Sequence, residues 1–337
     1  MSKYFDDYDK KYPNIVVEIL EYFDLQNQTP DHTKDKTILK FCEQHKQEKN
    51  YIYQPQIVSR ICKRLCDKGQ MECLRSEGGL GINDNFLFIC GKTEFFKNNR
   101  DLLKYYYNSM IYGFDYIYDL YKGLVVPLVW EKEDNSYSAG TGFKFMNGIV
   151  TAKHCVTDPK NLQIKGYKAT DLEGKPVFIS DNNGVDIAFI ETGDIANPLL
   201  FTDVGEIMQE VLVMGYPKIP AFTDFLTAEK ATISSKASSR ITPTLGAISA
   251  YGYEYLANIE AMLITARIRG GNSGGPVINE NGCLVGIACH IPDCNRENGD
   301  YDDLGYGIAV PVKYLLDIIE RKPKKLDIPS GFYRNFE

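Results

Sequence analysis

The change of pattern after Lys122 is the feature that most limits the fold. From residue 123 onward the chain has short apolar, often β-branched runs between turns: "LVVPLVWEK", "GTGFKFMNGIVTA", "EVLVMGYP" and "GPVINENGCLVGIA". Many short strands with no intervening helices favour a sandwich or a pair of barrels. One amphipathic segment, "PVKYLLDIIERK", predicts a helix near the C-terminus. We therefore expect an all-β region that one helix completes.

The first 122 residues show helical spacing instead. "NIVVEILEYFD" places Ile15, Ile19 and Phe23 four residues apart. The segment 55–69 begins with proline and ends with glycine, as helices often do. "MECLRSEGGLGINDNFLFI" then has two strand-like arms around a glycine-rich turn. Three helices followed by a hairpin is the order of a winged helix-turn-helix. The next segment predicts a long aromatic helix that breaks or bends near Gly113.

These patterns predict a multidomain α+β protein, and 337 residues leave room for about two domains. We assign residues 1–91 to a mostly helical, winged-helix-like module and residues 92–122 to a helical connector. Residues 123–316 form the expected β-barrel domain. Residues 317–337 contain the end of the C-terminal helix and a tail.

Charge and hydropathy exclude some classes of function. The formal net charge is −7, and residues 1–122 hold 18 Lys+Arg and 18 Asp+Glu, so the whole excess lies beyond them. No global basic field favours nucleic acid. The N-terminal segment "MSKYFDDYDKKYPN" lacks the basic flank and apolar core of a secretory signal. The most apolar run, "GLVVPLVW", is far shorter than the roughly 20 residues that cross a bilayer. We expect a cytoplasmic protein without membrane contact.

Nine cysteines in no regular spacing favour reduced thiols in a cytoplasm over a disulfide framework. Two groups have the residue types of a zinc site: Cys62 with Cys66, and Cys289 with His290 and Cys294. The chain has no CxxC pair to anchor zinc. We therefore predict no metal and no other cofactor.

The segment "IVTAKHCV" places His154 next to Cys155. Three interpretations are open: a cysteine nucleophile, a metal-binding pair, or a histidine base beside an idle cysteine. A second segment, "RGGNSGGPV", surrounds Ser273 with glycines. A serine hydroxyl is a weak nucleophile without a base, and it needs backbone N–H groups aimed at the developing oxyanion. Glycines let the backbone turn its amides toward one point. The alternative is an ordinary tight loop.

A base and an orienting acid are also present. His154 follows the β-run "NGIVTAK", so it is expected at a strand end, where the alternative is a surface residue. Asp186 in "VDIAFI" is flanked by apolar residues. A buried charge is costly unless it is paired. A carboxylate in a barrel interior would therefore need a partner such as His154.

The order His154, Asp186, Ser273 in an all-β region resembles the trypsin-like, chymotrypsin-fold serine proteases. The matching segments are "TAKHC", "DIAFI" and "GNSGGP", with "GTGF" before the histidine. The segments "VLVMGYP", "AEKATISS", "CLVGIA" and "GYGIAVP" are similar to the HtrA and V8-type branch. The resemblance covers about Leu124 to Leu316 and leaves no room for a PDZ domain after the last helix.

The resemblance implies two six-stranded β-barrels and a Ser-His-Asp triad. Ser273 is then the nucleophile, His154 the base and Asp186 the group that orients the imidazole. The N–H groups of Gly271 and Ser273 form the oxyanion hole. Cys155 is expected in the barrel wall as a free thiol, because neighbouring residues on a strand point to opposite faces. Asn272 departs from the aspartate of digestive trypsins, so their activation switch is not expected.

The resemblance also predicts a substrate pocket. Its walls are assigned to Arg267, Ile268, Gly270, Cys289, His290 and Ile291. Arg267 stands where trypsin has an aspartate, which argues against cleavage after Lys or Arg. Together with His290 it would favour an acidic substrate side chain. The alternative is that Arg267 points to solvent and His290 lies on the rim.

We therefore expect an intracellular serine endopeptidase that acts on proteins or peptides. Residues 1–122 would dock or regulate it through a protein partner. The alternative is a DNA-binding or adaptor protein built on a protease-like scaffold. Arg60, Lys63 and Arg64 on the third predicted helix form the basic surface that such an alternative needs.

Overall fold

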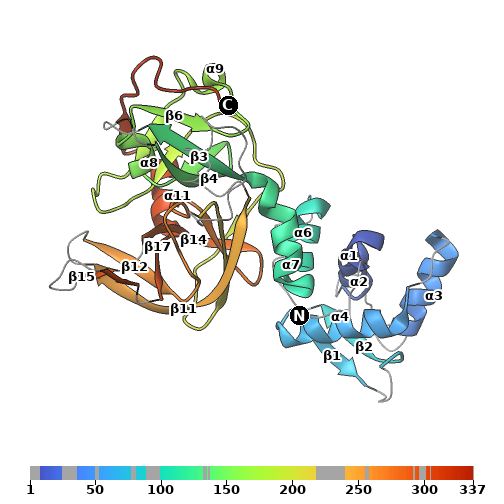
Figure 1. Ribbon diagram of the computed structural model, residues 1–337. Coiled ribbons are helices and arrows are strands. Elements are labelled where there is room, and N and C mark those ends of the chain that lie inside the picture. The colour runs from blue at the N-terminus through green and yellow to red at the C-terminus, as the bar shows by residue number, and fades with distance from the viewer. Residues whose placement is uncertain are drawn as a thin grey trace. The chain divides into compact units, whose positions relative to one another are not determined.

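The protein divides into two compact units, Met1–Tyr116 and Ile117–Glu337, which are described one at a time. We analysed a computed structural model of the chain (Figure 1). It describes residues 8–24, 36–49, 53–76, 81–88, 99–131, 135, 137–217, 240–254, 258–290, 293–295, 301–303 and 305–336. The predicted domain ranges remain predictions.

The first unit contains short helices and one two-stranded sheet. Its elements are α1 (Tyr8–Lys11), α2 (Ile15–Tyr22), α3 (Ile38–Lys49), α4 (Pro55–Asp67), β1 (Met71–Arg75), β2 (Asn85–Phe88) and α6 (Arg100–Tyr112). Ile15, Ile19 and Phe23 are fully buried, as their four-residue spacing predicts. β1 and β2 pair antiparallel, which confirms the predicted hairpin after α4. The winged-helix assignment itself stays a prediction.

A buried polar group lies among these helices. Glu18 on α2 accepts a hydrogen bond from the Tyr53 hydroxyl, and His45 Nε2 lies 3.4 Å from the same carboxylate. The other ring nitrogen, His45 Nδ1, lies 2.9 Å from the Phe41 carbonyl. Buried polar groups remain stable when they are hydrogen-bonded in this way.

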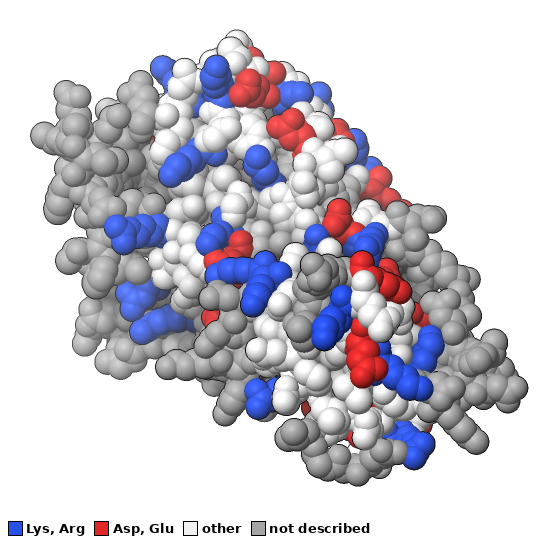
Figure 2. All heavy atoms as spheres, turned by 90° about the vertical axis from the view of Figure 1, so that its right-hand side faces the viewer, with Lys and Arg blue, Asp and Glu red and all other residues white. Residues whose placement is uncertain are grey.

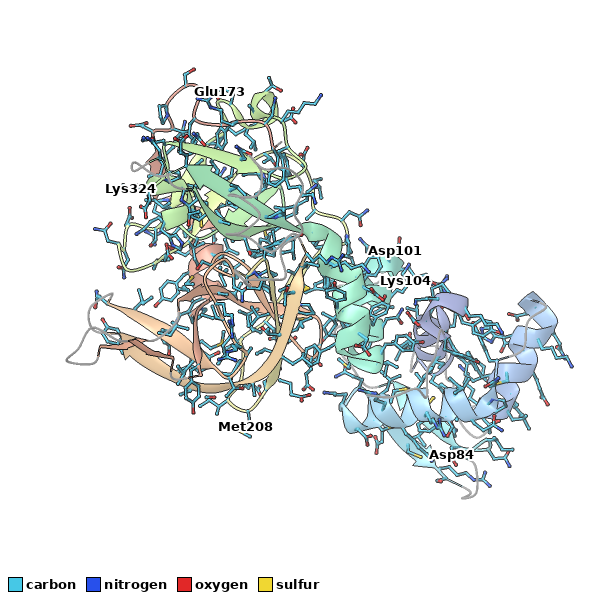
Figure 3. The ribbon with its side chains drawn as sticks, in the orientation of Figure 1. Asp84, Asp101, Lys104, Glu173, Met208 and Lys324 are labelled. Carbon is cyan, nitrogen blue, oxygen red and sulfur yellow. The ribbon has the colours of Figure 1, made fainter. Side chains whose placement is uncertain are left out.

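The predicted long aromatic helix is interrupted at Gly113, as expected. α6 ends there, at a glycine with φ of 77°, and α7 (Phe114–Tyr121) follows directly. The Asn99 side chain accepts a hydrogen bond from the Leu102 N–H and so caps the start of α6. Asp101 and Lys104 form an exposed ion pair of 2.8 Å on the first turns of this helix (Figure 3).

The second unit has two large sheets, which confirms the double-barrel prediction. The first sheet has the strand order β18-β7-β8-β5-β4-β3-β6. Its strands are β3 (Val125–Glu131), β4 (Tyr137–Phe145), β5 (Gly148–Thr151), β6 (Asn161–Ile164), β7 (Val177–Ile179), β8 (Ala188–Ile190) and β18 (Lys324–Leu326). Two four-residue helices, α8 (His154–Thr157) and α9 (Ala169–Leu172), lie between its strands in the sequence. Leu128, Trp130, Ile149 and Ile190 belong to its buried core.

The second sheet closes on itself. Its order is β13-β10-β11-β12-β17-β14, and β13 also pairs with β14, so six strands form a ring, with β9 added at β14. The bounds are β9 (Phe201–Thr202), β10 (Glu210–Gly215), β11 (Thr242–Glu254), β12 (Ile259–Ile264), β13 (Pro276–Asn279), β14 (Cys283–His290) and β17 (Gly307–Pro311). A small ribbon, β15 (Asp293–Asn295) with β16 (Tyr301–Asp303), follows β14 in the chain. Val211, Val213, Ile264 and Val277 lie in the buried core of the ring.

The first sheet is a half-barrel over the described residues, and the C-terminal tail lies on both of its edges. The predicted helix is present as α11 (Val312–Arg321). After it, β18 pairs with β7. Tyr333 then forms a bridge to Leu162 on β6, and the Leu162 N–H donates to the Phe332 carbonyl at 2.9 Å. Pairing of this kind covers the exposed donors and acceptors of edge strands. Sequence patterns predicted the helix but not this use of the tail.

The described residues were also searched for membrane-spanning helices, metal-binding groups and disulfides. In the part of the chain that the structure describes, no helix is long and apolar enough to cross a membrane. The same residues contain no group of three or more His, Cys, Asp or Glu side chains arranged to hold a metal. The side chains of seven of the nine cysteines are described, and all seven are free thiols.

Candidate active site

The structure brings His154 and Asp186 together beside the half-barrel. The Asp186 carboxylate lies 2.8 Å from His154 Nδ1 through Oδ2, and its Oδ1 accepts the His154 backbone N–H at 3.0 Å. Two bonds to one residue fix both the position and the ring orientation of the imidazole. Asp186 lies just before β8, with 28% of its side chain exposed, so its side chain is partly exposed and not enclosed in the expected barrel interior. The Trp130 ring packs edge-on against the imidazole, with centroids 6.4 Å apart.

The local structure at His154 differs from the prediction. α8 begins at this residue, three residues after β5 ends at Thr151, so His154 and Cys155 are neighbours on a helical turn and not on a strand. Cys155 is nevertheless fully buried in the core of the half-barrel, while 37% of the His154 side chain is exposed. The expected separation of the two side chains is present, but helical geometry produces it.

The environment of His154 favours its protonated form. Burial lowers the pKa of the imidazole, but the hydrogen bond to Asp186 and the proximity of Cys155 outweigh burial and raise the pKa above its usual range. A carboxylate at Nδ1 stabilises the imidazolium that forms when the other ring nitrogen accepts a proton. The pair is therefore arranged as a base with an orienting carboxylate.

Ser273 lies on a tight loop immediately before β13 of the closed barrel. Gly271 and Gly274 have φ values of 101° and 88°, which glycine tolerates best. Three N–H groups of this loop are used internally: Asn272 donates to Arg269, Gly274 to Ala288 and Gly275 to Asn272. The hydroxyl of Ser273 donates to the Cys289 carbonyl at 3.1 Å. Among the described residues it forms no hydrogen bond with His154.

The N–H groups of Gly271 and Ser273 in the same loop are the predicted oxyanion donors. Within the described chain, neither the Gly271 N–H nor the Ser273 N–H has a hydrogen-bond partner. Gly271 is buried, and a buried N–H without a partner costs free energy unless a ligand or water accepts from it. The alternation of used and unused donors therefore leaves two amides for an incoming oxygen atom.

The predicted pocket residues have different surroundings. Ile268 is 2% exposed and belongs to the core of the closed barrel. A Cβ on Gly307 would lie 2.5 Å from its Cδ1, so the absence of a side chain at Gly307 makes room for Ile268. Cys289 is buried behind the loop, and its Sγ lies 3.5 Å from the Asp186 carbonyl.

Arg267 and Gly270 are exposed. His290 is the last residue of β14, and its side chain lies outside the described part, as does Ile291. The structure therefore does not test the proposed acid preference.

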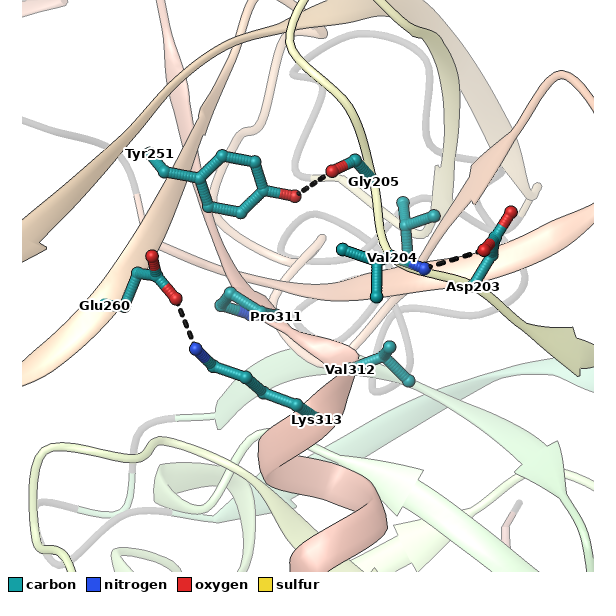
Figure 4. A pocket seen from close by; sticks show the side chains of 9 residues that line it. Asp203, Val204, Gly205, Tyr251, Glu260, Pro311, Val312 and Lys313 are labelled. Carbon is teal, nitrogen blue, oxygen red and sulfur yellow. Dashed lines mark hydrogen bonds and ion pairs between the residues drawn. The ribbon is translucent and has the colours of Figure 1, made fainter.

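A separate apolar hollow lies in the second sheet region and contains none of the predicted site residues (Figure 4). Its floor and walls include Val204, Val285 and Val312. The Tyr251 hydroxyl donates to the Gly205 carbonyl at 2.7 Å across one side. On the rim, Glu260 and Lys313 form an exposed ion pair.

Comparison with known proteins agrees with this arrangement. Residues 140–287 match the family model of the trypsin-like peptidase domain. The second unit contains a trypsin-like peptidase domain. This match includes His154, Asp186 and Ser273, and it ends within β14.

Curated relatives are proteases of the Do-like type. The chain is 27% identical over 209 residues to "Protease Do-like 2, chloroplastic" of Arabidopsis thaliana, covering 60% of this chain and 31% of the relative. It is 26% identical over 210 residues to "Serine protease Do-like HtrA" of Bacillus subtilis, covering 59% and 42%. The chain thus spans well under half the length of these relatives.

Solved structures that match part of the chain do so at low sequence identity. A protease from M. tuberculosis in its active form is 18% identical, with a TM-score of 0.45 and coverage of 65% of this chain and 88% of that one. A serine endoprotease from Yersinia pestis is 22% identical, with a TM-score of 0.41 and coverage of 61% and 65%.

Sequence analysis missed two groups beside the peptidase domain's predicted triad. One is the Cys289 carbonyl, which accepts the Ser273 hydroxyl. No residue type signals this role, because every residue has a carbonyl. The other is Thr141, whose hydroxyl contacts the Gly271 carbonyl. It lies in the "GTGF" segment, which contributes to the family resemblance but carries no sign of a contact with Gly271.

Proposed function

We propose that the protein is a serine endopeptidase in which His154, Asp186 and Ser273 act as a triad. The observation that carries this proposal is the pair of hydrogen bonds that Asp186 accepts from His154, in a domain whose nucleophile loop leaves the Gly271 and Ser273 N–H groups without a partner among the described residues. A carboxylate-oriented imidazole and two free amides are the parts that acyl transfer needs. A scaffold protein has no use for all of them together.

The reaction begins with rotation of the Ser273 hydroxyl away from the Cys289 carbonyl and toward His154 Nε2. Ser273 Oγ attacks the carbonyl carbon of the peptide bond, and His154 takes its proton. The carbonyl oxygen becomes an oxyanion that the Gly271 and Ser273 N–H groups stabilise. His154 then gives the proton to the leaving amine, which leaves an ester on Ser273. Water, deprotonated by His154, hydrolyses that ester and restores the hydroxyl.

Covalent labelling tests the nucleophile directly. We expect a fluorophosphonate probe to label the wild-type chain, with the modified peptide mapping to Ser273. The matched control is Ser273→Ala, which should remain unlabelled. Labelling of that variant at the wild-type level would contradict the assignment.

The substrate pocket stays a proposal. Arg267 and His290 are expected to favour an acidic residue before the cleaved bond, since a cation facing a carboxylate forms a strong hydrogen bond. Cleavage of a mixed peptide library would test activity and this preference together. In the Arg267→Glu variant the preference should reverse. An unchanged profile would place Arg267 outside the pocket.

The role of residues 1–122 and the intracellular setting are also proposals. We expect this part to dock a protein partner that regulates the peptidase domain. On α4, Arg60 and Lys63 are exposed, which keeps DNA binding as the alternative. Figure 2 shows acidic side chains interspersed among basic ones on the face in view. Salt-sensitive retention on DNA that is lost in an Arg60→Glu, Lys63→Glu variant would favour the alternative.

A further inference from the structure

Thr141 connects the half-barrel to the nucleophile loop of the closed barrel. It lies on β4 and its side chain is fully buried. Its backbone N–H donates to the Ser273 carbonyl at 2.9 Å, and its hydroxyl donates to the Gly271 carbonyl at 2.6 Å. Both bonds therefore end on the two residues whose own N–H groups are unused.

The hydroxyl of Thr141 has a defined direction. The Tyr216 N–H donates to Thr141 Oγ1 at 2.9 Å, so the oxygen accepts from one side while its proton points to the Gly271 carbonyl. The Thr141 carbonyl accepts the Thr151 hydroxyl at 2.8 Å. With its N–H, carbonyl and hydroxyl all bonded, Thr141 is held on several sides.

These bonds restrict the peptide planes that aim the unused amides. The carbonyls of Gly271 and Ser273 belong to planes on either side of the plane that contains the Ser273 N–H. Fixing the two outer planes limits rotation of the plane between them. Gly271 has a φ of 101°. Because glycine can adopt many other backbone conformations, a contact from outside the loop is needed to keep it in this one. The Thr141 hydroxyl supplies such a contact.

The side chain of Asn272 does not supply this restraint through its amide oxygen. Asn272 is 1% exposed, yet its Oδ1 has no hydrogen-bond partner among the described residues. A Cβ on Gly215 would lie 2.7 Å from this oxygen and 3.0 Å from Thr141 Oγ1, so both atoms lie against the same glycine. Of the side-chain oxygens of Asn272 and Thr141, the Thr141 hydroxyl is therefore the one that hydrogen-bonds to the loop.

We propose that Thr141 is a positioning residue that holds the Gly271–Ser273 backbone with its two free N–H groups directed at the oxyanion. The proposal rests on the proposed peptidase function. The hydroxyl does not touch the substrate. It acts through the loop, so its loss should weaken the transition state more than substrate binding.

The test compares Thr141→Val with Thr141→Ser in the full chain. Valine keeps the shape but lacks the hydroxyl, whereas serine keeps it. Removing an oxyanion donor lowers kcat about 10²–10³-fold. In Thr141→Val the two donor N–H groups remain but are held less firmly in position, so we expect a smaller fall in kcat, about 10- to 100-fold. We expect KM to change little and Thr141→Ser to recover most of kcat. Thr192→Val is the matched control, because it removes another buried threonine hydroxyl, one that contacts Asn147 at 3.4 Å.

A peptide boronate gives a second readout, since its adduct with Ser273 places an oxygen where the two amides point. Its affinity should fall in Thr141→Val by about the same factor as kcat, with no fall in Thr192→Val. A wild-type kcat in Thr141→Val, or equal losses in the valine and serine variants, would overturn the positioning role. If Ser273 of the wild type is labelled by fluorophosphonate in that case, the proposed function stands. An unlabelled wild type would overturn both.

Discussion

The two barrels of the second unit contribute to the site in different ways. The half-barrel supplies side chains, His154 and Asp186, which are fixed to each other by two hydrogen bonds. The closed barrel supplies Ser273 and a backbone loop whose shape depends on glycines with positive φ. In the proposed site, the contribution of the half-barrel therefore depends on the ionisation of His154 and Asp186. The contribution of the closed barrel depends on the backbone geometry of the Ser273 loop. Substitutions on the two sides should therefore have different signatures.

The largest effect is expected when either barrel loses its central group. Ser273→Ala and His154→Ala should each lower kcat by about six orders of magnitude, and the double variant should lose little more, because the residues of the proposed triad would act as a unit. Single-turnover kinetics with a peptide ester would measure all three. Additive losses would show that the two barrels contribute independently.

The ionisation of the half-barrel side is tested by Asp186→Asn. We expect kcat to fall about 10⁴-fold. The free imidazole is the base, so activity rises with pH through the pKa of His154, which Asp186 raises in the wild type. Without the carboxylate, the hydrogen bond and the charge of Asp186 no longer raise this pKa, so the pKa of His154 should fall. In a pH–activity profile, the midpoint of the increase in residual activity should therefore move to lower pH. A midpoint at the same pH as in the wild type would contradict the proposed pairing.

The backbone side is tested by Gly274→Ala. A Cβ there would lie 2.2 Å from the Thr141 carbonyl, at a φ of 88°. Strain and overlap together should lower the free energy of unfolding by about 3 kcal/mol or more. Gly174→Ala is the matched control, because this glycine also has a positive φ but nothing within 4 Å. That variant should lose about 1–2 kcal/mol. Equal losses in urea unfolding would mean that close approach at Gly274 does not matter.

The smallest effect is expected at the rim of the apolar hollow. Lys313 and Glu260 form an ion pair with side chains 57% and 43% exposed. Exposed pairs contribute less than about 1 kcal/mol, so Lys313→Ala should leave unfolding nearly unchanged and activity intact. A fall in kcat in this variant would show that the closed barrel's outer surface communicates with Ser273.

Sequence reasoning reached the parts of the site that have a residue-type signature. Glycines around Ser273 and a histidine after a strand led to the predicted nucleophile, which lies on the closed barrel, and to the predicted base, which lies beside the half-barrel. It misjudged the turn at His154, because four residues are too few to show helical periodicity. It also missed the bond from Thr141 to Gly271, whose residues are 130 positions apart. A contact of that range depends on the assembled fold and leaves no local pattern.

The same limit applies to the chain's last segment. The segment "IPSGFYRNFE" shows no strand alternation, and residues 317–337 were assigned only as the end of the C-terminal helix and a tail. In the fold, Phe332 and Tyr333 are 4% and 3% exposed and belong to the core of the half-barrel. The burial of two aromatic rings, which favours packing strongly, determined the tail's path where local propensity did not.

The tail also sets an order of events during synthesis. β18 pairs with β7, and Tyr333 bridges to Leu162 on β6, so the sheet that carries His154 and Asp186 keeps two open edges until residues 324–333 have left the ribosome. Ser273 and its loop emerge earlier. A growing chain would therefore hold a complete nucleophile loop before its base is firmly seated. Firm seating of the proposed base would then have to wait for residues 324–333, which follow Ser273 in the chain.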